Sequence, residues 1–466
     1  MNPIQYPIVQ PGGIDGMLPP RVIREWRGVN GFDPYSIADS FFTDASNVTT
    51  DDFPAFATCE GYEVLGSAIG AKVLGLGVWK DAELHAIFDD GTWRKWTGAA
   101  WSTALASGLN TTAMWSFTNF EGGWGAMNLV GCNGVNGLRR YDGSTVQAFG
   151  NAPSNANHVT TYQNRLWVAF GLEIRACQLD NGNIWDDFSG DESDSYGKTL
   201  ESAHGENVNM LSGGLAKLVI GMPNALQELY GSIPSDFQTR PVSEETGVEN
   251  NNSALIHDAT LYGVHRDSIY TYVSGGVSPD REFSDIVRKF IAGTSGASTG
   301  SDGRKLYFFV PGKILIYDTV FQTWTIRTGI TVTCFTLFKN ELYIGTNDGR
   351  VVKLGGETDA GQPINWHVVT RIFTNGSISQ RSRWLKLHIM AELAVGSTIN
   401  VYLSETQDGN DWELVKTITG TGAAIEKVLV PVKKFVLSNM LRVKLEGIGW
   451  ARVHELSLQG RQLPLT

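Results

Sequence analysis

The stretch NELYIGTNDGRVVKLGG, Asn340–Gly356, holds two short apolar segments separated by the turn Asn347–Gly349. Leu342 and Ile344 alternate with their neighbours, as residues on one face of a strand do. An Asn-Asp-Gly turn joins antiparallel strands readily because glycine tolerates positive φ. The stretch therefore predicts a β-hairpin.

Six other stretches repeat this hairpin pattern. They read AELHAIFDDGTWRKW (82–96), MNLVGCNGVNGLRRY (127–141), NRLWVAFGLEIRACQL (164–179), AKLVIGMPNALQELYG (216–231), ATLYGVHRDSIYTYV (259–273) and RKLYFFVPGKILIYD (304–318). A leucine holds the same place in each copy, at Leu84, Leu129, Leu166, Leu218, Leu261, Leu306 and Leu342. Successive leucines are 36 to 52 residues apart, near the ~40–50 residues of a four-stranded propeller blade.

The repeat predicts an all-β chain with a β-propeller of about seven blades over residues 66–355. The seven leucines are then expected to be buried around one axis. The scatter in spacing leaves another β-rich arrangement open, because any long all-β protein has hairpins at irregular intervals.

The composition is typical of turn-rich β structure. The 466 residues include 53 Gly, 14 Trp, 14 Tyr and 21 Phe, and only 18% are charged, against ~25% in average soluble domains. These values argue against a helical bundle, a coiled coil or a disordered chain. We expect strand in well over a third of the residues and helix in under about a tenth.

The residues after the repeats follow a different pattern. Four stretches alternate cleanly between apolar and polar residues, at 384–390, 398–403, 427–432 and 441–445. They predict a separate β-sandwich or jelly roll over 363–466. A polar joint is expected at 356–362, and an extended N-terminal arm with the first strands at 1–65.

The net charge of −11 is unevenly distributed. Residues 363–466 carry 12 basic and 8 acidic side chains, which leaves 25 basic and 40 acidic in 1–362. Such an acidic surface does not wrap DNA by neutralising phosphates, but it can line a passage through which DNA slides. The acidic loop 180–206 is a candidate for part of that wall, with a solvated outer-rim loop as the alternative; 243–253 is a second polar loop.

No motif for catalysis, cofactor or metal binding is found. HExxH, GxSxG, Walker A and helix-opening GxGxxG patterns are absent, and Cys59, Cys132, Cys177 and Cys334 form no CxxC pair. We therefore expect no enzyme activity, no cofactor and no metal site, with reduced, buried cysteines. Calcium binding by the acidic loop is a weak alternative, because DxDxDG spacing is missing. The stretch Ser404–Trp412 resembles the structural Asp-box turn of sialidases, with the spacing between Asp408 and Gly409 off by one residue.

The sequence contains no membrane-length apolar run, and its start lacks the pattern of a secretory signal. Basic Arg21, Arg24 and Arg27 lie in a Pro/Gly-rich stretch that reads as extended. With Trp26 it suits docking on a neighbouring subunit, or equally folding back to close the chain's own ring.

Three short elements follow in order near the N-terminus: WRGVN (26–30), TDASNV (43–48) and EGY (60–62). This order resembles the opening of tail nozzle, hub and stabilisation proteins of tailed bacteriophages, which continue as a β-propeller. Pro223–Phe237 is also similar to blade sequences of these proteins. The chain departs at the third element, where Cys59 and Glu60 replace a basic residue and Pro.

The resemblance implies a non-enzymatic structural protein of the virion tail, synthesised in the host cytoplasm. A homo-oligomeric ring around the DNA exit path is expected, with other tail or connector proteins as partners and DNA passing without sequence-specific binding. Two alternatives stay open: a receptor-binding, fibre or decoration module of the virion, and a carbohydrate-active propeller enzyme.

Overall fold

The computed structural model describes residues 18–276, 278–375, 377–422, 426–430 and 437–463. Strand accounts for 48% and helix for 2% of the chain, which confirms the predicted all-β composition. The chain divides into two compact units, each described here by itself. Unit 1 comprises Met1–Gly61, Tyr317–Thr328 and Gly356–Thr466, and unit 2 comprises Tyr62–Ile316 and Gly329–Gly355.

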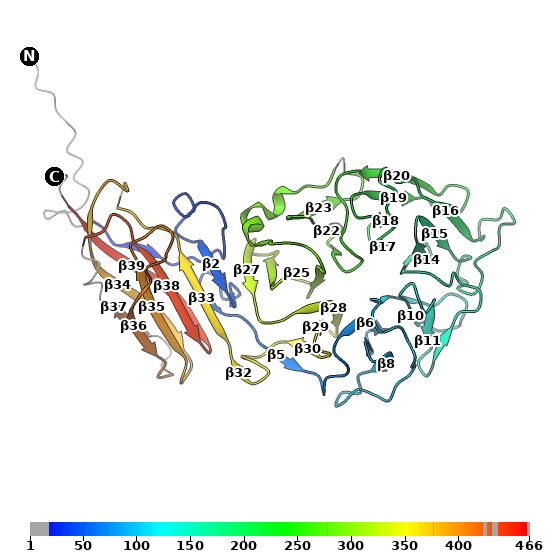
Figure 1. Cartoon of the computed structure of the whole chain (residues 1–466), viewed down its shortest axis with the longest axis horizontal. Coiled ribbons are helices and arrows are strands. Elements are labelled where there is room, and N and C mark those ends of the chain that lie inside the picture. The colour runs from blue at the N-terminus through cyan, green and yellow to red at the C-terminus, as the bar shows by residue number, and fades with distance from the viewer. Residues whose placement is uncertain (1–17, 277, 376, 423–425, 431–436, 464–466) are drawn as a thin grey trace, which may run out of the picture. The chain divides into compact units, whose positions relative to one another are not determined.

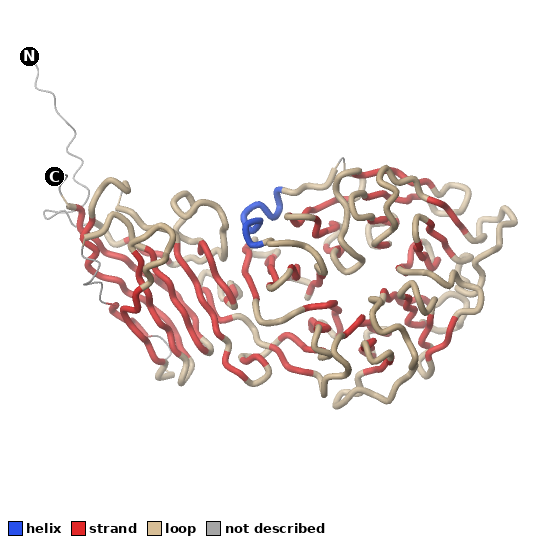
Figure 2. Tube along the Cα trace, in the orientation of Figure 1, coloured by secondary structure: helices blue, strands red, loops and turns tan. Residues whose placement is uncertain are grey.

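Unit 2 consists of small antiparallel sheets (Figures 1 and 2). The strands of the first three sheets are β6 (Val73–Trp79), β7 (Glu83–Phe88), β8 (Thr92–Lys95); β9 (Ser116–Phe120), β10 (Asn128–Cys132), β11 (Arg139–Tyr141), β12 (Val146–Ala148); β13 (His158–Tyr162), β14 (Arg165–Phe170), β15 (Glu173–Ala176) and β16 (Tyr196–Thr199). The next sheets contain β17 (Met210–Ser212), β18 (Leu218–Gly221), β19 (Leu226–Tyr230), β20 (Gln238–Ser243); β21 (Ala254–His257), β22 (Thr260–His265), β23 (Ser268–Val273); β24 (Ser298–Ser301), β25 (Lys305–Val310) and β26 (Lys313–Asp318). The last sheet has the order β28 (Val332–Phe338), β29 (Glu341–Thr346), β30 (Val351–Leu354) and β5 (Tyr62–Val64).

The repeated hairpins lie where the sequence places them, one in each of these sheets. All seven anchor leucines are buried, with exposed fractions of 0 to 3%, as the repeat predicted. Each core cluster joins two neighbouring sheets; Leu84 and Phe88 of β7, for example, belong to the cluster of Tyr343 and Val351 in β29 and β30. Burial between sheets is therefore what holds unit 2 together.

The sheets surround a common centre (Figure 1). The first strand of a sheet contacts the first strand of the next for β6, β9, β13 and β17, and for β21, β24, β28 and back to β6. A 3-10 helix, Glu282–Phe290, follows β23 and buries Val287 and Phe290 (Figure 2).

Unit 1 is built on two antiparallel sheets with many long strands. One contains β3 (Val48–Thr49), β4 (Phe56–Thr58), β39 (Ala451–Gln462), β34 (Ser382–Leu393) and β37 (Glu426–Val430), with β1 (Arg21–Ile23) paired to β39. The other has the order β2 (Phe42–Ser46), β33 (Asn365–Thr370), β38 (Arg442–Ile448), β35 (Thr398–Ser404) and β36 (Glu413–Thr419). Three short strands complete the unit: β27 (Thr323–Arg327), β31 (Thr358–Asp359) and β32 (Gln362–Pro363).

An aromatic cluster joins the two sheets of unit 1. The Phe56 ring of β4 lies 5.1 Å from the Phe42 ring of β2 and 6.1 Å from the Trp366 ring of β33, measured between ring centroids. Trp26 stacks on Phe42 at 5.0 Å and is 1% exposed. The interpretation of Trp26 as a docking residue for a neighbouring subunit is therefore wrong, because its indole is already buried.

The N-terminal residues complete the sheets of the C-terminal part. β1 and β4 pair with β39, and β2 pairs with β33. The sequence-based prediction treats 1–65 as a separate N-terminal arm and includes 317–328 in the repeat region 66–355. The structure groups 18–61 and 317–328 with the C-terminal strands, whereas 62–65 of the arm belong to unit 2, where Tyr62–Val64 pairs with Val352–Leu354. Contacts this distant in sequence leave no trace in local patterns.

Candidate functional site

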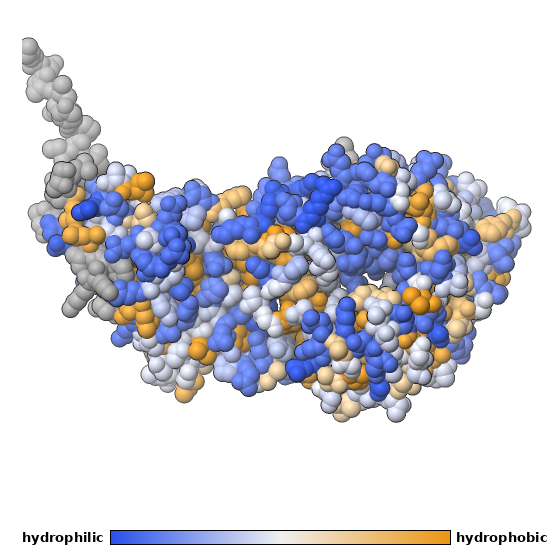
Figure 3. Space-filling model, in the orientation of Figure 1, coloured by the Kyte–Doolittle hydropathy of each residue, from blue (hydrophilic) through white to orange (hydrophobic). Residues whose placement is uncertain are grey.

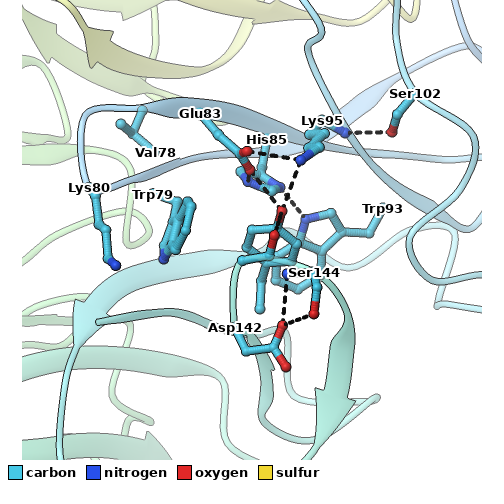
Figure 4. Close-up of polar contacts among 12 residues, drawn as sticks. Val78, Trp79, Lys80, Glu83, His85, Trp93, Lys95, Ser102, Asp142 and Ser144 are labelled. Atoms are coloured by element: carbon cyan, nitrogen blue, oxygen red, sulfur yellow. Dashed lines mark hydrogen bonds and ion pairs between the residues drawn. The ribbon is translucent and has the colours of Figure 1, made fainter. Parts of the chain in front are cut away.

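A cluster of titratable side chains connects two neighbouring sheets of unit 2 (Figure 4). We call Glu83, His85, Lys95 and Tyr141 the Glu83 cluster. Lys95 Nζ donates to Glu83 Oε1 at 2.9 Å and to the Tyr141 hydroxyl at 3.1 Å. The Tyr141 oxygen also lies 2.8 Å from Glu83 Oε2. Strand alternation explains the placement, since Glu83 precedes the buried anchor Leu84 and faces the other way.

The electrostatics of this cluster stabilise an ion pair. Burial favours the neutral form of Glu83, but hydrogen bonds from Lys95 and Tyr141 outweigh burial and hold the pKa of Glu83 below its ordinary value. The hydrogen bond to Glu83 raises the pKa of Lys95. Carboxylate and ammonium therefore stay charged at neutral pH, and each is a hydrogen-bond partner of the other.

His85 lies behind this pair and is fully buried. Its Nδ1 accepts a hydrogen bond from the Trp93 indole at 3.0 Å, and its Nε2 lies 3.4 Å from Glu83 Oε2. Burial lowers the pKa of His85 to about 4, although the charge of Glu83 opposes this change. The ring is thus neutral at pH 7, and Nδ1 is its unprotonated nitrogen.

These groups are of the types that perform acid-base catalysis, but here they hold one another. A catalytic base needs access to the proton of a substrate. The charged and phenolic groups of the Glu83 cluster are paired within the cluster, and none of its four residues lines the central cavity of unit 2. The four side chains thus link the two sheets, and we call such a polar link between neighbouring sheets a clasp.

A second clasp occurs three sheets further along the chain. Glu228 of β19 has no exposed surface and accepts hydrogen bonds from Lys217 and Arg240, both at 3.1 Å. Ser274, after β23 of the neighbouring sheet, donates to Glu228 Oε1 at 3.0 Å. Burial opposes ionisation, but these partners lower the pKa of Glu228. A buried carboxylate with this many partners is again a structural element.

Sequence reasoning missed these clasps, although a signal was present. The residue before each anchor leucine is polar in all seven hairpins: Glu83, Asn128, Arg165, Lys217, Thr260, Lys305 and Glu341. Because side chains alternate along a strand, this position faces away from the leucine. Glu83, Lys217 and Glu341 at this position each form a salt bridge.

The acidic loop 180–206 is organised around one buried cation. The Arg165 guanidinium donates to the carbonyls of Cys177 at 3.0 Å, Ser193 at 3.1 Å and Glu192 at 2.7 Å, and to that of Asp194. Asp194 itself is buried. Burial opposes ionisation of Asp194, but hydrogen bonds from Gly190, Ser189 and Asp191 outweigh it and lower its pKa.

This loop does not face the centre of unit 2. Most of it joins β15 to β16, the third and last strands of their sheet, whereas β13 is the strand that contacts the neighbouring sheets. Asp186 and Asp191 are exposed, and the loop lies at the outer side of unit 2 in Figure 1. Within unit 2 the loop therefore lies on the outer rim, and the hypothesis that it lines the lumen of an oligomeric ring stays a prediction.

The centre of unit 2 contains a cavity of about 480 Å³. Its lining comes from the segments that lead into the first strands of several sheets and from two hairpin turns: Lys72, Met114–Ser116, Asn157–His158, Asn250–Asn252, Ser295–Ala297, Phe309, Pro311–Gly312, Thr331–Thr333 and Asn347. The face of unit 2 in Figure 3 is hollowed near its middle. Segments from six sheets thus converge on one space.

Asn251, in the loop before β21, lies in the lining of this cavity. Asn251 Nδ2 lies 3.4 Å from Ser116 Oγ of β9, and Asn251 Oδ1 lies 3.4 Å from the Leu211 amide of β17. One amide side chain thus spans three sheets. His158 lies on the wall, where burial lowers its pKa to about 4 despite a hydrogen bond to Val208, so this ring is also neutral at pH 7.

The remaining sequence-based candidates have structural roles. In the Asp-box-like stretch, Asp411 accepts hydrogen bonds from Ser404 and Thr406, and Gly409 has a φ of +66°. The four cysteines are free and buried, as expected, and burial raises the pKa of Cys334 to about 11. Within the described residues, no three His, Cys, Asp or Glu side chains gather as metal ligands would. The described part of the chain also contains no helix with the length and apolarity to cross a membrane.

No protein-family model matches the chain, and no curated protein matches it. Solved structures resemble it at low identity. A computationally designed protein, Ika8, has a TM-score of 0.42 and 11% identity over 66% of this chain and 93% of its own. Virginiamycin B lyase from Staphylococcus aureus has a TM-score of 0.46 and 12% identity over 67% of this chain and 98% of its own.

The extracellular domain of a two-component system from B. thetaiotaomicron has a TM-score of 0.47 and 11% identity over 66% of this chain. The chain spans 40% of that protein. These neighbours are β-propeller-like proteins.

Proposed function

We propose that this chain is a non-enzymatic structural subunit of a bacteriophage tail, of the nozzle or hub type. One observation carries the proposal. The N-terminal elements that resemble tail proteins contain the residues that fix unit 1. Gly28 has a φ of +77°, and a Cβ there would lie 2.0 Å from the Trp324 carbonyl oxygen. Trp26, two residues earlier, is in the aromatic core.

The second element contributes in the same way. Asn47 has a φ of +57°, which asparagine tolerates better than most residues. Its side chain donates to the Asn365 carbonyl at 2.8 Å and accepts from the Thr328 amide at 2.8 Å. The motifs that carry the resemblance are thus determinants of the fold, as expected of a structural protein.

As part of the proposal, unit 2 is a seven-bladed propeller. Seven sheets each contain one hairpin of the repeat, and the first strands of six of the seven successive pairs of sheets are in contact among the described residues. The last sheet takes β5, the strand next to β30, from before the first blade, with Glu63 opposite Lys353. Such a strand closes the ring by joining both ends of the repeat. Unit 1, with two sheets around an aromatic core, is then a module of the β-sandwich type.

DNA would pass between copies of the chain and not through one of them. The central cavity of about 480 Å³ is in the range of small-ligand sites, whereas the major groove alone of B-DNA is about 12 Å wide. A homo-oligomeric ring with closed symmetry therefore supplies the lumen in this proposal. The acidic excess of residues 1–362 supports passage of DNA without binding.

Quantitative mass spectrometry of purified particles tests this function. Particles released from cells that carry the encoding genome should contain the chain at a fixed ratio to the portal protein, through repeated gradient purification. Absence from particles, with the chain abundant in the same lysate, would refute a virion role. Light scattering on the isolated chain then shows whether the ring forms alone or only on the particle.

A further inference from the structure

The central cavity of unit 2 offers polar groups that the fold does not use. The side-chain amides of Asn157, Asn252 and Asn347 make no hydrogen bond with any described residue, and the Lys72 ammonium forms no ion pair with one. Each of these residues comes from a different sheet or turn, yet all line one space. Amides both donate and accept, so they match the hydroxyl groups of a ligand.

The charge of the lining differs from that of the chain. The protein has 48 acidic residues, but none of the described residues that line the cavity is Asp or Glu. Lys72 carries the one formal charge among them, and His158, also in the lining, is neutral at pH 7. A cationic ligand would meet a positive charge and no carboxylate. An anionic ligand would be attracted by Lys72, whereas the net negative charge of the rest of the chain repels anions.

The size and the remaining surface of the cavity limit the ligand further. About 480 Å³ suits a molecule of monosaccharide size, at the small end of the usual ~300–1,000 Å³ range. Met114, Trp115, Phe309 and Pro311 supply apolar surface between the amides. Alternating apolar and amide groups fit a sugar ring, whose C–H faces are apolar and whose edge carries hydroxyls.

From this chemistry we propose that the cavity binds a sugar acid of monosaccharide size, a hexuronate, with its carboxylate at Lys72 and its hydroxyls at the three amides. The site is independent of the tail function proposed above, because it lies within one chain and needs no oligomer.

Three sugars that differ in charge test the proposal by isothermal titration calorimetry at pH 7: D-glucuronate, D-glucose and D-glucosamine. The intact chain should bind glucuronate most tightly and glucosamine least. Lys72→Met should weaken glucuronate binding about tenfold, as expected for one charge-assisted hydrogen bond, and leave glucose binding unchanged. Lys416→Met, an exposed lysine in β36 outside the lining, is the matched control and should bind as the intact chain does.

A second pair of variants tests the amides. Asn157→Leu with Asn347→Leu should abolish binding of glucuronate and glucose together, whereas Asn207→Leu, an exposed position outside the lining, should not affect either. Circular dichroism confirms that each variant folds. The proposal is overturned if glucuronate does not bind at 10 mM, if glucosamine binds as well as glucuronate, or if Lys72→Met has no effect. Inorganic phosphate that binds as tightly as glucuronate would also overturn it, because the site would then recognise charge alone.

Discussion

The Tyr141 hydroxyl oxygen lies 2.8 Å from Glu83 Oε2, although Tyr141 belongs to β11 and Glu83 to β7 of the neighbouring sheet. Strands within a sheet are joined by ladders of backbone hydrogen bonds, whereas separate sheets are joined mainly by side chains, with isolated backbone bonds such as that from the Trp115 amide to the Leu74 carbonyl at 2.8 Å. Most of the joining surface is apolar, so a polar contact of this kind fixes the register between two sheets. Glu228 and Ser274 form a similar contact further along.

Removing the Tyr141 hydroxyl should weaken the contact between the sheet of β6–β8 and the sheet of β9–β12. Tyr141→Phe keeps the ring against Trp79 and His85 but deprives Glu83 and Lys95 of a shared partner. We expect a loss of about 1–2 kcal/mol in the stability of unit 2, the usual range for hydrogen bonds to partly buried charged groups. Urea denaturation, monitored by hydrogen exchange in peptides of unit 2, measures this loss of stability.

Tyr230→Phe serves as the control for this experiment. The Tyr230 hydroxyl bonds to Gln238 within the same sheet at 2.9 Å and is exposed. Its removal should change stability by less than about 0.5 kcal/mol. Equal losses in the two variants would show that the clasp contributes nothing specific.

Acid should destabilise unit 2 before most carboxylates titrate. Burial lowers the pKa of His85 and of His158 to about 4, below the 6.5 of an unfolded histidine. The unfolded chain therefore binds more protons between these values, and stability falls as pH decreases from about 6.5 toward 4. Each ring should contribute a loss of about 2 kcal/mol between pH 7 and pH 5.

The pH dependence is measured by urea denaturation at pH 7, 6 and 5. His85→Gln should reduce its slope, because glutamine does not titrate. The exposed His204 provides a control, and His204→Gln should leave the slope unchanged. A slope that is the same in the intact chain and in His85→Gln would contradict the buried, neutral state of His85.

The sequence predicted the hairpins well because their information is local. Alternation, a glycine turn and a leucine anchor specify each one, and every anchor proved to be buried. The core position of Trp26 depends on Phe42, Phe56 and Trp366, of which Trp366 is 340 residues away, so no pattern near Trp26 shows it.

The cavity was equally beyond sequence reasoning. Asn157, Asn252 and Asn347 each resemble an ordinary loop asparagine, and only the convergence of the sheets brings them to one space. The polar residue before each anchor leucine was a usable signal for the clasps. The composition of the acidic loop predicted neither which strands it joins nor that Arg165 organises it.

Backbone crowding at Gly28 gives a prediction for unit 1. Gly28→Ala combines a φ of +77° with a Cβ 2.0 Å from the Trp324 oxygen, so the bridge between the two residues should break. Gly361→Ala shares the positive φ, +83°, but meets nothing within 4 Å. The backbone strain of alanine at a positive φ, which both variants share, costs about 1–3 kcal/mol.

We therefore expect Gly28→Ala to lower the thermal midpoint of unit 1 by several degrees more than Gly361→Ala does, in scanning calorimetry. Equal shifts would show that φ alone, and not the contact with Trp324, makes glycine necessary at position 28.

Arg165 should control the order of the acidic loop. Arg165→Met keeps most of the side-chain volume but removes the Arg165 donor from the carbonyls of Cys177 and Glu192, whereas the Ser193 carbonyl keeps the Leu179 amide as a donor. Buried carbonyls without partners cost about 1–3 kcal/mol each. Hydrogen exchange in peptides covering 180–195 should speed up by at least about tenfold, with little change in peptides of β6–β8. Uniform acceleration throughout unit 2 would indicate global unfolding instead.

The location of the chain in the particle tests the central claim most directly. Cryo-electron microscopy of purified particles, with the two units fitted separately into density, should place copies of the chain in a closed ring around the DNA path of the tail. Density for the chain at fibre tips or on the capsid surface, away from the tail axis, would contradict the structural role and favour a receptor-binding or decoration module.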